Sequence, residues 1–151
     1  MKTQNFFVIT LLLSILFLSP SCKKTNENEF ELCGSCSNTE ISGDYSGSGQ
    51  YFTDDNPLKT ESVDVKLSLE STDTDFFNID IEVPEKFSKS YFAARNEDGA
   101  AISISGSTKS INLTIYKNEN EYQINGTAKV YHSRSDTLFL DHSVSFTVFK
   151  K

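Results

Sequence analysis

The chain has little positive charge and few histidine or cysteine residues. Its 151 residues include 14 Lys and Arg against 21 Asp and Glu, giving a net charge of −7. A negative surface repels phosphate backbones and anionic headgroups, which disfavours nucleic-acid binding and a polybasic membrane patch. Two His and three Cys leave little material for catalysis or metal binding. The length is typical of one modest domain.

The longest apolar run, Phe6 to Leu18, stands near the N-terminus, between Lys2 and the small-residue stretch Ser19-Pro20-Ser21. Its thirteen residues would span about 20 Å as a helix, short of the roughly 30 Å of a bilayer's hydrocarbon core. The pattern therefore predicts a cleaved export signal over residues 1–21 and not a transmembrane helix.

Cys22 directly follows these small residues, and the arrangement resembles the looser, serine-rich lipoprotein signals of Bacteroidetes. The resemblance implies that Cys22 becomes the acylated first residue of a mature protein anchored in the outer membrane. Burial of acyl chains, at about 0.8 kcal/mol per CH₂, gives a lasting attachment when two or more chains are present. The alternative is a secreted protein cut near Ser21. Which face of the outer membrane would carry the protein stays open.

Residues 22–40 are polar and show neither strand nor helix periodicity, which is typical of a tether. Within them Cys33 and Cys36 have the C-x-x-C spacing of a redox pair, half a zinc site or a small disulfide ring. A redox pair needs a βαβ unit and a zinc site needs a second ligand pair, and neither accompanies it. With Cys22 acylated, the two remaining cysteines in an oxidising compartment predict a local disulfide.

From Ile41 onward, short segments of alternating apolar and polar residues are separated by turn residues. The clearest are Val63–Leu69 and Phe77–Val83, and about eight such strands can be counted up to Val148. Their short connections permit antiparallel pairing and exclude the crossovers of a parallel sheet. Residues 41–151 are therefore predicted to be an all-β antiparallel meander that closes into a small barrel, with a two-sheet sandwich as second choice.

The opening Ile41-Ser-Gly-Asp-Tyr-Ser-Gly47, the turn Ile104-Ser-Gly-Ser107 and the segment Asn112-Leu-Thr-Ile-Tyr116 resemble the small calycin-like, lipocalin-like lipoproteins of Bacteroidetes. The resemblance covers Ile41 to Lys151 and implies a small barrel that in some members holds an apolar ligand. The chain has no Trp and so lacks the Gly-x-Trp of classical lipocalins, which leaves the broader barrel class.

No catalytic or metal site is predicted. Asp141, His142 and Ser143 are the residue types of a triad, but neighbours on a strand point to opposite faces. His132 and His142 share an inward phase, yet the expected hairpin register separates them by about 16 Å. We therefore expect neither an enzyme nor a cofactor. Asp136-Thr137-Leu138 resembles the acceptor triplet of Bacteroidetes O-glycosylation, with Thr137 as the acceptor.

Two functions fit this reading. In the first, the barrel holds a small apolar ligand, although the same inward residues could simply fill the interior. The predicted lining residues, with space at Gly126 and Ala128, are Val65, Leu67, Phe77, Ile79, Gly126, Ala128 and Phe146.

In the second, the domain is a surface module that binds a protein or glycan through its outside. It is suggested by aromatic residues on the phase opposite the aliphatic faces, namely Phe76, Tyr116, Tyr131, Phe139 and Phe149. Strand propensity alone would also place aromatic rings there.

Overall fold

The structure is a computed structural model that describes residues 29–54, 59–72, 75–135 and 137–151. The predicted export signal and the predicted lipidation residue Cys22 lie outside the described residues. Among the described residues, no helix is long and apolar enough to cross a bilayer.

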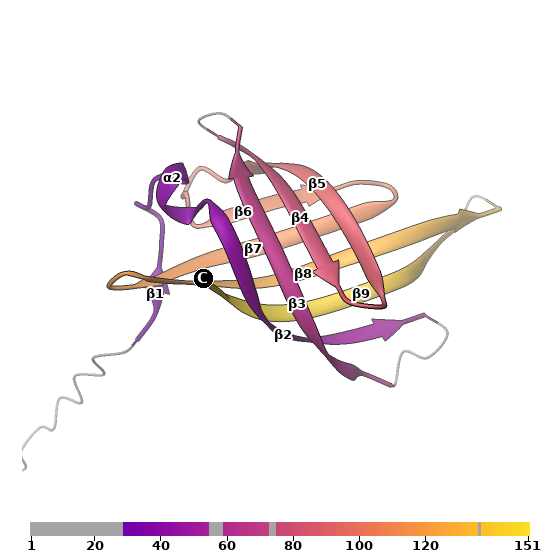
Figure 1. The fold of residues 1–151 in the computed structure, drawn as a ribbon. Coiled ribbons are helices and arrows are strands. Elements are labelled where there is room, and N and C mark those ends of the chain that lie inside the picture. Colours follow the sequence, from indigo (N-terminus) through magenta and orange to yellow (C-terminus); the bar gives the residue numbers. More distant parts are fainter. Residues whose placement is uncertain (1–28, 55–58, 73–74, 136) are drawn as a thin grey trace, which may run out of the picture.

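The described residues form antiparallel strands and one short helix (Figure 1). The elements are β1 (Glu31–Leu32), α2 (Asn38–Ile41), β2 (Gly43–Thr53), β3 (Glu61–Ser71), β4 (Phe76–Val83), β5 (Phe87–Arg95), β6 (Ala101–Ser105), β7 (Lys109–Asn118), β8 (Glu121–Arg134) and β9 (Thr137–Lys150). The predicted all-β antiparallel class is confirmed.

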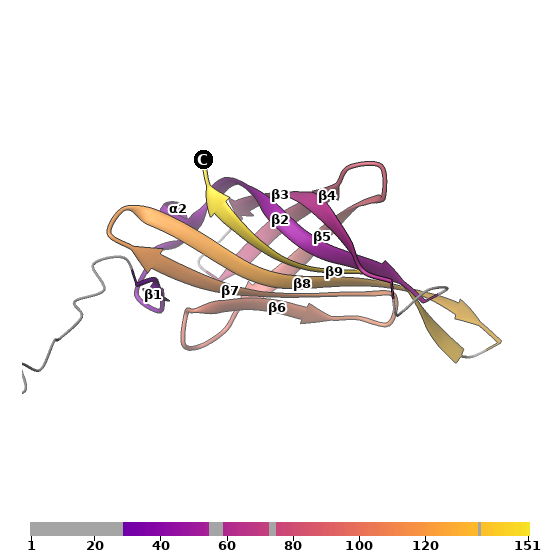
Figure 2. The same ribbon diagram turned by 90° about the horizontal axis from the view of Figure 1, so that it is seen from below.

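Strands β2 to β9 follow one another as a meander, and β2 also pairs with β9, which closes a ring of eight strands. The short β1 is a ninth strand, added to β7. The ring is uneven: β5 and β6 pair at Ala94–Ser103 and Arg95–Ile102, whereas β8 and β9 pair along almost their whole length. Figures 1 and 2 show β7, β8 and β9 side by side in one layer, so both predicted shapes, barrel and sandwich, describe part of the molecule.

The interior is built from the alternate apolar residues that the sequence pattern predicted to face inward. On β3, Val65, Leu67 and Leu69 are at most 2% exposed, and on β4 the side chains of Phe77 and Ile79 are fully buried. Period-two alternation sends the polar residues between them to solvent. One apolar core therefore fills the ring.

The alternation breaks once, on the hairpin of β8 and β9. Val130 pairs with His142 but Tyr131 pairs with Leu140, so Asp141 is an extra residue in a β-bulge. A bulge of one residue exchanges the two faces of the strand beyond it. Leu138 continues the apolar alternation of Val144 and Phe146 along the sequence, which predicts that it faces inward with them, but it is 53% exposed.

The same bulge overturns the expected outward position of Phe139. This residue pairs with His132, and the two rings stack with centroids 5.6 Å apart. Past the bulge, the hairpin extends beyond the ring (Figure 1).

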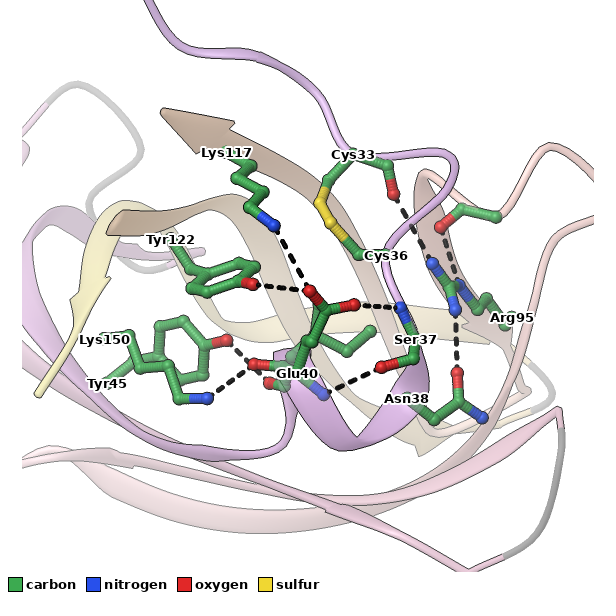
Figure 3. Close-up of a disulfide and its surroundings, with 12 residues drawn as sticks. Cys33, Cys36, Ser37, Asn38, Glu40, Tyr45, Arg95, Lys117, Tyr122 and Lys150 are labelled. Carbon is green, nitrogen blue, oxygen red and sulfur yellow. Dashed lines mark hydrogen bonds and ion pairs between the residues drawn. A yellow bond between two sulfur atoms is a disulfide. The ribbon is translucent and has the colours of Figure 1, made fainter. Parts of the chain in front are cut away.

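One end of the ring is closed by the segment that the sequence predicted to be the second half of the tether. Figure 3 shows Cys33 joined to Cys36 by a disulfide beside α2. Both cysteines are buried, and Ile41 is fully buried at the end of the helix. These three apolar side chains fill the end of the core, so the packed domain begins before the expected boundary at residue 41. We call residues 33–41 the plug.

Polar contacts tie the plug to the sheet (Figure 3). Arg95 donates to the carbonyl oxygen of Gly99 (2.6 Å), to Asn38 Oδ1 (2.8 Å) and to the Cys33 carbonyl oxygen (3.4 Å). On the other side of α2, the Glu40 carboxylate accepts from the Ser37 backbone N–H, from Lys117 and from Tyr122.

The Ser37–Glu40 pair forms a capping box at the start of α2. The Ser37 backbone N–H donates to the Glu40 carboxylate at 2.7 Å, and Lys117 Nζ and the Tyr122 hydroxyl each lie 3.2 Å from it. The hydrogen bonds from Ser37, followed by that from Lys117, lower the pKa of Glu40 to about 2. The carboxylate therefore stays ionised and keeps its contacts to the sheet in all but strong acid.

Two buried tyrosines provide a matched test of this packing. The Tyr45 hydroxyl donates to the Ile41 carbonyl oxygen at 2.6 Å, whereas the Tyr91 hydroxyl has no hydrogen-bond partner among the described residues. We expect Tyr45→Phe to lower the free energy of unfolding by about 1–2 kcal/mol, because the carbonyl loses its partner. Tyr91→Phe should cost nothing or stabilise. Chemical denaturation of both variants measures this, and an equal loss in the two would contradict it.

Candidate functional site

The residues predicted to line a ligand cavity all belong to the inner face. Val65, Leu67, Phe77, Ile79 and Ala128 are at most 2% exposed, and Phe146 is 5% exposed. The structure therefore brings the predicted set together around one interior. Burial is equally expected of a packed core.

The space expected at Gly126 is occupied. A Cβ placed on Gly126 would lie 2.5 Å from Cζ of Phe146 and 2.7 Å from Cδ2 of Leu113. The Phe146 ring thus fills the volume that the missing side chain leaves. At Gly126, where the missing side chain favoured a cavity, the inner wall is packed and not hollow.

The end of the ring opposite the plug carries an aromatic cluster. The ring of His142 stacks on Tyr51 and on Phe87, with centroids 5.9 and 5.6 Å apart. His142 Nδ1 lies 2.6 Å from the Tyr51 hydroxyl, and His142 Nε2 lies 3.4 Å from Asp141 Oδ2. Asp141 is the extra residue of the bulge, and its side chain reaches that of His142. The expectation that neighbouring side chains on this strand point to opposite faces is therefore wrong for Asp141 and His142.

Strand pairing brings the two histidines closer together than expected. His142 pairs with Val130, two positions from His132, so the expected separation of about 16 Å is wrong, and both residues line the same small pocket beside the β8–β9 hairpin. Among the described residues, however, no group of three His, Cys, Asp or Glu side chains is placed to hold an ion. Ser143, the third residue of the triad considered from the sequence, is buried and pairs across the sheet with Lys129.

A groove of about 1120 Å³ lies on the outer face of β6, β7, β8, β9 and β2. It is lined by outward side chains of these strands and by the exposed Ile104, with parts of the inward Gly49, Ile111, Gly126 and Phe146 completing its floor. We call it the outer groove.

Strand register arranges the groove's polar side chains in rows. One row crosses six strands, from β6 through β7, β8, β9 and β2 to β3, and the next crosses four. The first row is Ser103, Asn112, Thr127, Ser145, Gln50 and Ser62, and the second is Thr114, Asn125, Thr147 and Ser48. Every member is a hydroxyl or an amide.

The side chains of the rows make few hydrogen bonds to one another, so many of their donors and acceptors face solvent. Thr147 Oγ1 donates to Asn125 Oδ1 at 2.9 Å, and Gln50 Nε2 donates to Ser62 Oγ at 3.1 Å. The hydroxyls of Thr127 and Ser145 are 3.4 Å apart. Each hydroxyl can donate one bond and accept others, so these pairs retain free donors and acceptors.

The groove is almost without charge in a strongly acidic chain. Lys129 is the one ionisable side chain in its lining, although the whole sequence carries a net charge of −7. This site is not predicted from the sequence, because its rows of side chains form only across paired strands. A local signal was present in the alternation Asn112-x-Thr114, Asn125-x-Thr127 and Ser145-x-Thr147.

The outward aromatic rings do not form a single cluster. Phe76 stacks on Phe92 over β4 and β5, with centroids 5.1 Å apart. Tyr116 and Phe149 belong to one row at the plug end of β7, β8 and β9. Tyr131 pairs with Leu140 on the distant hairpin. This scattering weighs against one aromatic partner site.

Thr137, the predicted O-glycosylation acceptor, is the first residue of β9 and is exposed. The preceding residue of the triplet, 136, lies outside the described residues.

Comparison with models of known protein families and with curated proteins gave no match to this chain.

The packing at Gly126 can be tested by adding one methyl group. We expect Gly126→Ala to lower the free energy of unfolding by about 1–3 kcal/mol, because the methyl collides with Phe146 and Leu113. Gly106→Ala is the control, since its Cβ would meet one turn carbonyl at 3.1 Å. Denaturation curves report both. If Gly126→Ala were tolerated as well as the control, the interior would have room for a ligand.

Proposed function

We propose that the protein is an exported, lipid-anchored binding module of the cell envelope, and that its outer groove binds an uncharged, hydroxyl-rich ligand such as a neutral glycan. The observation that carries the proposal is the two rows of neutral hydroxyl and amide side chains across the sheet. The anchor rests on the N-terminal sequence pattern ending at Cys22.

Neutral hydrogen-bonding side chains suit a sugar for two physical reasons. Sugar hydroxyls both donate and accept, as do the Ser, Thr, Asn and Gln side chains of the rows. Binding such a ligand also removes little charge from water, which avoids the large desolvation cost of buried ions. A phosphorylated or sulphated ligand would find Lys129 alone among the groove's lining residues and an acidic chain around it.

An apolar ligand inside the ring is the less supported function. The Phe146 ring occupies the space at Gly126, and the plug fills one end of the core with Cys33, Cys36 and Ile41. Retention of a native apolar molecule after mild extraction would favour this alternative.

Removal of two groove hydroxyls tests the proposal. We expect the wild-type protein to bind members of an array of neutral oligosaccharides more strongly than sialylated or sulphated ones. The double variant Thr127→Val with Ser145→Ala should weaken binding about 10- to 100-fold, because each lost hydrogen bond is worth roughly 0.5–1.5 kcal/mol.

The matched control is Ser88→Ala, which removes an outward hydroxyl from β5, outside the groove lining. It should bind like the wild type. Binding that is confined to charged sugars, or that is unchanged in the double variant, would reject the groove as a glycan site.

The anchor is tested separately. Cys22→Ser should move the protein from the membrane fraction to the soluble fraction and abolish the acyl mass increment of the mature chain. Fractionation and intact mass spectrometry measure the two effects. Unchanged membrane association with no acyl mass in the wild type would exclude lipidation, without bearing on the groove.

A further inference from the structure

A cluster of exposed and half-buried apolar side chains lies on the outer face at the plug end of the sheet. Leu32 on β1 is 63% exposed and Phe149 on β9 is 46% exposed. The rings of Phe30 and Phe149 meet edge to face with centroids 6.0 Å apart. We call Phe30, Leu32, Tyr116 and Phe149 the apolar end patch.

Strand register shows that the patch is one surface. Leu32 is opposite Tyr116 on β7, Tyr116 is opposite Gln123 on β8, and Gln123 is opposite Phe149 on β9. Directly opposed residues project to the same face of a sheet. The four strands therefore present Leu32, Tyr116, Gln123 and Phe149 in one row, three of them apolar, with Phe30 packed against Phe149 at its end. Single exposed apolar residues need no explanation, but a gathered set marks an interaction surface.

The position of the patch in the chain indicates what covers it. Phe30 is eight residues after Cys22, and eight extended residues reach at most about 29 Å. An acyl group on Cys22 would therefore hold the patch close to the bilayer surface at a high effective concentration.

We propose that the apolar end patch lies against the lipid surface and orients the domain on the membrane; this rests on the proposed anchor at Cys22. Phe and Leu side chains enter the headgroup boundary, and Tyr suits the interface because its ring is apolar and its hydroxyl polar. Two cations next to the patch are engaged within the fold: Lys117 is paired with the Glu40 carboxylate and Lys150 donates to the Glu40 carbonyl oxygen. We therefore expect the contact with the bilayer to be mainly apolar.

The chain has no Trp, so a single introduced Trp is a unique fluorescent reporter. Phe149→Trp places it in the patch. Leu138→Trp is the matched control, because Leu138 is also exposed but lies eleven positions earlier on the same strand, which corresponds to roughly 35 Å. Leu32→Trp is a second patch reporter should Phe149→Trp fail to fold.

The experiment uses the chain from Cys22 onward, which contains every described residue. Cys33 and Cys36 are joined, so the Cys22 thiol can be coupled to a maleimide lipid in phosphatidylcholine vesicles that contain brominated acyl chains. This attachment needs neither native acylation nor a glycan, so the result is independent of the tests of anchor and groove.

We expect brominated lipid to quench Phe149→Trp at least threefold more than Leu138→Trp, with a blue-shifted emission that 0.5 M NaCl leaves unchanged. Adding Leu32→Ser to Phe149→Trp should reduce the quenching. Equal quenching of the two reporters, or none of either, would overturn the proposal. Quenching that salt abolishes would also overturn it, because the contact would then be electrostatic.

Discussion

The pairing of β2 with β9 is the constraint on which the rest of the molecule depends. Every other neighbouring pair in the ring joins strands that follow each other in the chain, whereas this one places Tyr45 opposite Lys150 and Thr53 opposite His142. Without it, β2 and β9 would be open edges with unpaired backbone groups. Closure gives the sheet one enclosed face and one solvated face. Successive side chains along each strand then point alternately to the enclosed face and to the solvated face.

Because the alternation has a period of two, the core and the outer groove depend on the same register. Ala128 belongs to the core and its neighbour Thr127 to the groove, so a slip of one residue would exchange them. The bulge at Asp141 shows this exchange locally: beyond it Leu138 is exposed and Phe139 stacks on His132. The neutral rows lie wholly on the ring side of the bulge, where the register with the core is intact. The same strand pairing that builds the core therefore also determines which side chains line the groove.

This dependence also explains what the sequence could predict. The alternation Val63–Leu69 and Phe77–Val83 was enough to predict an antiparallel all-β domain with the right inward residues. It could not show the bulge, because Leu138 and Leu140 continue the apolar alternation toward Val144 and nothing local marks Asp141 as extra. It could not show the groove either, since Thr127 and Ser145 become neighbours only through strand pairing. The plug has no periodicity, and its burial follows from filling the end of a ring that already exists.

The plug also links the fold to the proposed position on the membrane. If residues 22–40 were all flexible, the domain could turn freely on its anchor, and neither face would have a fixed direction. Arg95, Lys117 and the backbone hydrogen bond from Cys33 to the Ile115 carbonyl oxygen instead hold residues 33–41 on the sheet, and β1 pairs with β7 before them. Of the predicted tether, residues 22–40, only residues 22–30 then precede the first strand of the sheet. A short tether that leaves the sheet beside the outer face restricts how the domain can face the bilayer, and so the direction in which the groove opens.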